Sequence, residues 1–209
     1  METTKEKVSY CIGLETGKNL KQQFSDMDVS LLSQGIQDAL SDTPPRLSTE
    51  EIRSILVALR NQIQSQQKQF VTKLSEQNKQ EGEAFLSKNK SGEGIVALSN
   101  GLQYRVLKQG SGNKPSLFDV VEVHYKGSFI NGKVFDSSYD RGAPQALPVS
   151  RLIPGWSEAL QLMQVGDKWQ LYIPSYLAYG EQGFGPDIGP NCTLIFELEL
   201  LSINPAPKQ

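Results

Sequence analysis

A dispersed set of aromatic and apolar side chains around one carboxylate, in the C-terminal half of the chain, is the strongest candidate for a functional site. The set lacks the groups that break bonds, since it has no nucleophile beside a histidine, no second carboxylate and no cluster of metal ligands. Such residues suit an apolar cavity that holds a small hydrophobic group with a few polar anchors. Taken singly, each aromatic residue is more often part of a core than of a binding site. The members are Tyr125, Phe135, Asp136, Leu152, Ile153, Trp156, Tyr179 and Phe196.

The half of the chain that must position these residues has the pattern of a β-sheet. Nine of the eleven prolines and thirteen of the seventeen aromatic residues follow residue 98. Asn131-Gly132 is a hairpin signal, the apolar residues of 155–163 recur at helical spacing, and the loop 174–192 has the length of a functional loop. We therefore predict an α+β fold in which an antiparallel sheet wraps around one short helix. The expected strands are 102–108, 120–130, 133–135, 147–149, 168–173 and 193–203.

The first half of the chain has a helical pattern with few turn-forming residues. We predict a helix over 8–24, a second after an N-cap at Asp28, and a third opened by the capping box of Ser48 and Glu51. The third helix meets no proline before about Lys88, so it would be roughly 60 Å long at 1.5 Å per residue. The predicted domains are an all-α dimerisation domain at 1–47, a stalk helix at 48–90, a linker at 91–98 and a second domain at 99–209.

The apolar faces of the three predicted helices are together too small for a stable monomeric core. The third helix has a dense apolar stripe from Ile52 to Ile63, and beyond it the stripe thins among Gln, Lys and Glu. Burial against a second copy is the economical solution, because most soluble oligomers are symmetric homodimers. We predict a homodimer formed through residues 1–63. A monomeric helical extension that lies on the second domain is the alternative.

Charge and hydropathy argue against several classes of partner. The net charge is −2, and residues 1–98 hold 12 basic against 13 acidic residues, so we expect no basic face for nucleic acid. No apolar run approaches the ~20 residues of a membrane span. The polar start METTKEKVSY predicts no export signal and a cytoplasmic protein for the sequence as written. Cys11 and Cys192 fall in different predicted domains, so we expect no disulfide between them.

Two titratable residues near the set could be mistaken for acid–base catalysts. His124 is the sole histidine, but it neighbours Tyr125 on a predicted strand, where alternation sends the two side chains to opposite faces. Asp136 has no titratable partner that its motif predicts. We therefore expect neither residue to act as a conventional acid or base, and we expect no metal and no cofactor.

The C-terminal half contains the segments VHYKG, VFDSSYDRG, LIPGWSEAL, MQVGDKW, LAYGEQG and IGPNCTLIFELELL in this order. They resemble the FK506-binding-protein (FKBP) family of peptidyl-prolyl isomerases, and the resemblance covers about residues 99–203. SYCIGLETGKNL, a segment ending in DALSD and the long helix resemble the dimerising domain of macrophage infectivity potentiator (Mip)-type members. The resemblance implies an FKBP-like fold and an enzyme that rotates Xaa-Pro bonds in proline-containing polypeptides, as a homodimer that assists protein folding.

The resemblance also implies roles for individual residues. Trp156 would be the floor under the proline ring, and Asp136 a polar wall group beside Tyr125. The Ile153 N–H and the Tyr179 hydroxyl would bind substrate carbonyls. Phe184 and Ile188 would lie at the rim. The walls would be formed by Tyr125, Phe135, Leu147, Leu152, Ile153 and Phe196.

The same resemblance implies binding of macrolides such as tacrolimus or rapamycin. Gln145 and Leu147 stand where single-domain members have aromatic residues, so we expect this wall to be more polar or more open, which puts macrolide affinity and substrate preference in doubt. Residence in the periplasm or cell envelope is implied if an export signal has been removed. Two rival interpretations have no catalysis: a chaperone or adaptor that only binds, and a structural dimer with a vestigial barrel.

Overall fold

The computed structural model describes residues 2–24 and 26–204, and the chain divides into two compact units between Ile63 and Gln64. We call residues up to Ile63 the N-terminal unit and residues from Gln64 the C-terminal unit. The division lies inside the long helix and not at the predicted linker 91–98. That linker instead contains a short strand, β1 (Ile95–Ala97), which pairs with β2 (Gln103–Lys108) and so belongs to the sheet.

Within the described residues, three helices precede the sheet, and their starts follow the capping signals. They are α1 (Thr4–Gln23), α2 (Val29–Leu40) and α3 (Thr49–Asn89). The Asp28 carboxylate accepts hydrogen bonds from the N–H groups of Ser30 and Leu31, which confirms the predicted N-cap. Ser48 and Glu51 form the predicted capping box before α3. Helix α1 begins earlier than predicted because Thr3 and Glu6 form a capping box of their own.

The apolar side chains of the N-terminal unit lie open to solvent. Within the described residues, α1 and α2 contain no buried residue. Ile12 on α1 is 62% exposed, and Leu31 and Leu40 on α2 are 65% and 82% exposed. No helix among the described residues is long and apolar enough to cross a membrane.

The C-terminal unit is built on one antiparallel sheet, which has seven strands within the described part of the chain. Its order is β1-β2-β6-β7-β3-β4, and β5 pairs with the first residues of β3 beside β4. The predicted strands are therefore present, with β1 in addition. The remaining strands are β3 (Val120–Phe129), β4 (Val134–Ser137), β5 (Gln145–Pro148), β6 (Lys168–Ile173) and β7 (Leu194–Asn204).

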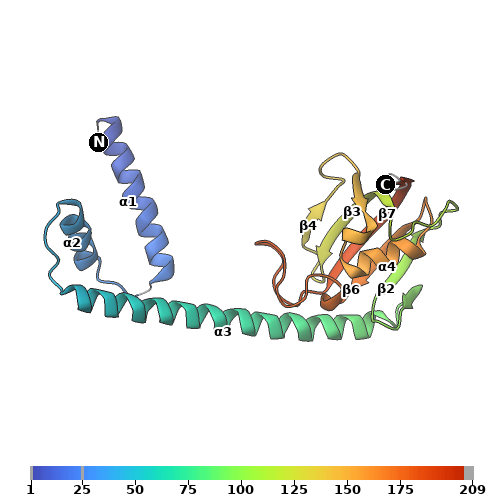
Figure 1. Ribbon diagram of the computed structural model, residues 1–209, viewed down its shortest axis with the longest axis horizontal. Coiled ribbons are helices and arrows are strands. Elements are labelled where there is room, and N and C mark those ends of the chain that lie inside the picture. Colours follow the sequence, from blue (N-terminus) through green and yellow to red (C-terminus); the bar gives the residue numbers. More distant parts are fainter. Residues whose placement is uncertain (1, 25, 205–209) are drawn as a thin grey trace. The chain divides into compact units, whose positions relative to one another are not determined.

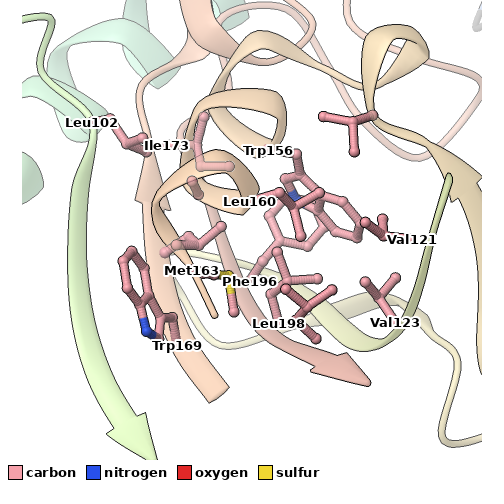
Figure 2. Packing of buried hydrophobic residues seen from close by; sticks show 14 of the residues in the cluster. Leu102, Val121, Val123, Trp156, Leu160, Met163, Trp169, Ile173, Phe196 and Leu198 are labelled. Carbon is pink, nitrogen blue, oxygen red and sulfur yellow. The ribbon is translucent and has the colours of Figure 1, made fainter. Parts of the chain in front are cut away.

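The short helix α4 (Pro154–Leu162) lies across one face of this sheet, as predicted (Figure 1). Figure 2 shows Trp156, Leu160 and Met163 on the side that faces Phe196 and Leu198 of β7. Leu160 and Leu198 are fully buried, and each such side chain stabilises the fold by about 1.5–3 kcal/mol. Gly155 allows this close approach, since a Cβ there would lie 2.6 Å from Cγ2 of Ile173. The core thus fixes the start of α4, which carries Trp156.

Candidate active site

A cavity of about 310 Å³ opens between the start of α4, strands β3 to β5 and the loop that follows β6. The structure brings ten of the eleven predicted site residues together around it. Arg151, in the 3-10 helix η1 (Val149–Arg151), also lines the cavity and was not predicted. The lining residues are Tyr125, Phe135, Asp136, Leu147, Arg151, Leu152, Ile153, Trp156, Tyr179, Phe184 and Phe196.

Aromatic rings packed edge to face form the inner wall of the cavity. Trp156 is only 5% exposed, and its ring centroid lies 5.0 Å from that of Tyr125 and 5.1 Å from that of Phe196, both near-perpendicular. Phe135 meets Phe196 in the same way at 5.6 Å. This geometry is the preferred one for aromatic pairs. It depends on Gly127, because a Cβ there would lie 2.7 Å from both phenylalanine rings.

The polar part of the wall is a cluster of Tyr125, Asp136 and Arg141. The Tyr125 hydroxyl donates a hydrogen bond of 2.6 Å to Oδ2 of Asp136, and the Arg141 guanidinium pairs with Oδ1. Nη2 of Arg141 also donates to the Tyr125 hydroxyl oxygen at 2.7 Å. Asp136 was expected without a titratable partner, and this was wrong. The signal that could have found Arg141 is its place in VFDSSYDRG, where a turn of the chain brings it back to Asp136.

The cluster keeps Asp136 ionised and Tyr125 protonated. Partial burial opposes ionisation of Asp136, but hydrogen bonds from Tyr125 and Arg141 and the charge of Arg141 outweigh it, so the pKa of Asp136 is lowered. Burial, reinforced by the hydrogen bond to Asp136, raises the pKa of Tyr125. A carboxylate engaged in this way is a poor proton shuttle, because its proton affinity is already reduced.

The N-terminus of α4 opens toward the cavity. Ile153 occupies the N-cap position without a side-chain cap, and its carbonyl accepts hydrogen bonds from Trp156 and Ser157. Within the described residues the Ile153 N–H has no hydrogen-bond partner. A free N–H at the positive end of a helix is suited to a carbonyl oxygen of a ligand.

The loop after β6 supplies the outer wall through Tyr179 and Phe184, whose rings stack with centroids 4.8 Å apart. Burial, with the Asp136 charge as a smaller cause, raises the pKa of Tyr179, so its hydroxyl remains a hydrogen-bond donor. Ile188 was predicted to lie at the rim, and this was wrong, because it does not line the cavity. It is 7% exposed, packs in the core and exchanges two backbone hydrogen bonds with Phe184, so it holds the rim residue from behind.

Gln145 does not make the cavity wall more polar. Its side-chain amide donates to the carbonyl oxygen of Pro144, and it is absent from the lining, whereas Leu147 two residues later is part of it. His124 lies on the face of β3 away from the cavity, as predicted. It stacks on Tyr139 with ring centroids 4.6 Å apart, and its Nδ1 is 2.9 Å from the Ser138 hydroxyl. The described residues hold no group of three or more potential metal ligands.

Comparisons with known proteins find relatives of both halves of the chain. Residues 111–201 match the family described as FKBP-type peptidyl-prolyl cis-trans isomerase, and residues 5–106 match the domain amino terminal to it. The outer membrane protein MIP of Legionella longbeachae is 43% identical over 99% of this chain and 88% of its own length. The FKBP-type 22 kDa peptidyl-prolyl cis-trans isomerase of Escherichia coli is 41% identical over 97% of each chain.

The fold is likewise similar to a solved structure along nearly the whole of this chain. The crystal structure of FkpA from Escherichia coli matches with a TM-score of 0.79 and 37% sequence identity, over 99% of this chain and 100% of that one. Both halves of the sequence and the overall fold point to one family. This chain belongs to the FKBP-type peptidyl-prolyl cis-trans isomerases and carries the amino-terminal domain found in its Mip and FkpA relatives.

Proposed function

We propose that the aromatic cavity is the place where this isomerase rotates Xaa-Pro bonds of polypeptide chains. The observation that carries the proposal is the combination of a Trp156 floor, walls of aromatic rings and one carboxylate already engaged by Tyr125 and Arg141. Such a cavity can enclose a proline ring but offers no nucleophile and no free acid–base pair. The chemistry must therefore proceed without breaking a bond.

Rotation about a prolyl bond is slow because amide resonance must be lost. The barrier is about 18–20 kcal/mol, and the uncatalysed reaction takes tens to hundreds of seconds. The twisted amide is less dipolar than the planar one, so a dry cavity destabilises the planar state more than the twisted state. Turnover in milliseconds needs a gain of about 10⁴-fold, or ~5–6 kcal/mol. Desolvation and shape complementarity together can supply an effect of this size.

The polar groups of the cavity would set the register of the substrate. The Ile153 N–H and the Tyr179 hydroxyl would donate to two substrate carbonyls and so hold the chain while the prolyl bond turns. Asp136, fixed by Tyr125 and Arg141, would orient the twisted carbonyl or its neighbours through its charge. These assignments predict that the free energy of substrate binding is distributed over several contacts, and that no single side chain accounts for most of it.

A peptide assay with a matched pair of tryptophan variants tests the cavity assignment. Trp156→Leu removes the floor, and we expect kcat/KM on a Leu-Pro or Phe-Pro peptide to fall by about tenfold or more, or ~1.4 kcal/mol. Trp169→Leu is the control, because Trp169 is equally buried at 6% but stacks on Tyr104 away from the cavity. Wild-type activity in Trp156→Leu would refute the assignment.

The same variant separates catalysis from binding alone. If Trp156→Leu loses isomerase activity but still suppresses aggregation of an unfolded client, the biological role is that of a chaperone and not of the isomerase. If both activities fall together, the cavity serves the client directly.

We further propose that the N-terminal unit pairs with a second copy. It contains a groove of about 580 Å³ between α2 and the start of α3, with apolar walls that include Leu31, Leu47 and Ile52. Helix α1 has exposed apolar residues, Ile12 among them, and no buried residue of its own within the described chain. A homodimer through residues 1–63 would bury both surfaces, and two isomerase domains could then act on one folding chain.

Macrolides such as tacrolimus or rapamycin would compete with substrate for the cavity. Support comes from its apolar lining and from the absence of Gln145 from that lining. The test is inhibition of the peptide assay, with Trp156 fluorescence as a direct binding signal and Trp156→Leu as the control. Inhibition without any change in Trp156 fluorescence would place the macrolide elsewhere.

We also propose that the protein works in the periplasm or cell envelope, because the Legionella longbeachae relative is named an outer membrane protein. Fractionation of the source cells with an antibody against the chain tests this. Recovery only in the cytoplasmic fraction would overturn it.

A further inference from the structure

Within the C-terminal unit, the last third of α3 packs along one face of the helix on the sheet and on the loop before β7. The docked residues recur at helical spacing, and the residues between them are exposed. Gly82 is the only buried residue of α3 among those the structure describes, and any Cβ there would overlap the hydroxyl of Thr193. Phe85 packs on Tyr172 with ring centroids 6.0 Å apart. The docked face comprises Leu74, Ser75, Asn78, Gly82, Phe85, Leu86 and Asn89.

Polar side chains of this face hold the segment that leads from the active-site loop into β7. Nδ2 of Asn78 donates to the Pro190 carbonyl oxygen at 2.8 Å. Nδ2 of Asn191 donates to the Ser75 hydroxyl at 2.8 Å. Both bonds join residues more than a hundred positions apart in the chain, so they tie the helix to one particular stretch of the loop.

Asn191 connects this anchor to the residue beside Tyr179. It adopts a left-handed backbone with φ of 54°, and its N–H donates to the Gly180 carbonyl oxygen at 2.8 Å. The Ser175 hydroxyl lies 3.5 Å from Oδ1 of Asn191, and Gly180 N–H donates back to the Ser175 carbonyl oxygen. Asn191 therefore joins the helix to both sides of the turn that presents Tyr179.

A hollow of about 520 Å³ lies between α3 and the loop, with Lys79 and Glu83 on the helix side and Gly180 and Glu181 on the loop side. Leu177, Ala178 and Tyr179 pack against the core. On the side of the hollow, the hydrogen bond between Ser75 and Asn191 links the turn to α3.

We propose that Asn191 and Ser75 are positioning residues of the isomerase, through which α3 fixes the Tyr179 hydroxyl over the cavity. The inference rests on the proposed role of Tyr179 in binding a substrate carbonyl. It makes α3 part of the active-site scaffold in addition to being a connection between the two units. The hydrogen bond that Tyr179 gives would be held in the planar and twisted states alike, so its loss raises KM more than it lowers kcat.

Two substitutions in the full-length protein test this without disturbing the backbone. Asn191→Gly keeps the left-handed conformation and the N–H to Gly180 but removes the side chain. Ser75→Ala removes only the partner on the helix. We expect each to lower kcat/KM on a prolyl peptide by about three- to tenfold, mostly through KM, with an unchanged melting temperature. Ser87→Ala, at an exposed position of the same helix, is the control and should behave as wild type.

A double-mutant cycle with Tyr179→Phe separates positioning from general stability. If Ser75 acts through the Tyr179 hydroxyl, Ser75→Ala causes no further loss once that hydroxyl is gone. A wild-type kcat/KM in Ser75→Ala, or losses that multiply in the double variant, would overturn the inference. If Tyr179→Phe is fully active while Trp156→Leu is not, this inference fails but the cavity assignment stands. If both are fully active, the proposed function itself fails.

Discussion

The two compact units use the same apolar residue types with opposite results. In the C-terminal unit Leu102, Leu160 and Leu198 are fully buried, because a sheet and a helix cover each other. In the N-terminal unit Ile36 and Leu40 lie 44% and 82% exposed, although they are four residues apart on α2, the spacing of an apolar helix face. The C-terminal unit buries its apolar side chains in its own core, whereas the N-terminal unit leaves an apolar face exposed to solvent.

This difference assigns different tasks to the two units. A closed core can hold the Trp156 floor and the aromatic walls in one arrangement, which a rigid cavity needs. Open apolar faces are instead the signature of a surface awaiting a partner. The last third of α3 belongs with the first kind, since Gly82 and Phe85 pack on the sheet domain. The boundary between the two tasks therefore runs through a single helix.

The largest expected effect comes from placing a charge on the open face of the N-terminal unit. Leu31→Asp puts a carboxylate in the apolar groove of each copy. We expect the proposed dimer to weaken about 1,000-fold or more, because two apolar contacts would be lost and two charges would be buried. Light scattering of the intact protein measures the change in mass.

Gln37→Asp adds the same charge at an exposed polar position of α2 and should leave the mass unchanged. If the wild-type protein has the mass of one chain, the N-terminal unit does not pair with a second copy. The N-terminal unit would then be a monomeric extension.

The closed core should respond to truncation where the surface of the same unit does not. Leu198→Ala removes a fully buried side chain, so the free energy of unfolding should fall by about 2–5 kcal/mol. Urea unfolding followed by tryptophan fluorescence reports on this unit, because Trp156 and Trp169 both lie in it. Leu107→Ala, at a side chain 42% exposed, should change the same quantity by less than about 0.5 kcal/mol. Equal effects would mean that the core is not closed.

Within the cavity, the loss of one charge should affect activity more than stability. Asp136→Leu removes the acceptor of Tyr125 and Arg141, and we expect kcat/KM on a prolyl peptide to fall by about tenfold or more, or ~1.4 kcal/mol. Asp140→Leu changes an exposed carboxylate in the same turn and should have little effect. Full activity in Asp136→Leu would mean that Asp136 has no role in catalysis and that the apolar walls of the cavity suffice.

The smallest expected effect is that of pH on the wild-type enzyme. The pKa of Asp136 is lowered below its ordinary value of 3.8, so the carboxylate stays ionised at and well below neutral pH. Its contribution to stability and to substrate orientation is fully present above that ordinary value and is lost as pH falls through the lowered pKa. We expect kcat/KM to be constant from about pH 8 to about pH 5 and to decline only below about pH 4.

Asp136→Asn should remove that low-pH decline. A titration of wild-type activity between about pH 5 and pH 6 that Asp136→Asn abolishes would mean that the pKa of Asp136 is raised and not lowered.

The local chemistry of the site residues was largely predictable, and their partners were not. Strand alternation placed Tyr125 and His124 on opposite faces, and helical spacing placed Trp156 in α4. Arg141 was not predicted, because its pairing with Asp136 depends on the path of a turn, which no periodicity encodes. Ile188 was misplaced for a similar reason, since the backbone pairing of Phe184 with Ile188 turns one side chain to the cavity and the other to the core.

The sequence by itself determined the elements: the caps at Asp28 and Ser48, the hairpin at Asn131-Gly132, the strands and the short helix are encoded by residues within a few positions of each other. Only the tertiary structure decided that α3 belongs to the N-terminal unit up to Ile63 and to the C-terminal unit beyond it. The same is true of the contacts of Ser75, Asn78 and Gly82 with a loop more than a hundred residues away. Those contacts have no local signature, because Ser, Asn and Gly on a helix are ordinary solvent-facing residues until another part of the chain packs against them. Short-range patterns specify which helix or strand forms, whereas long-range contacts specify which of its faces is used.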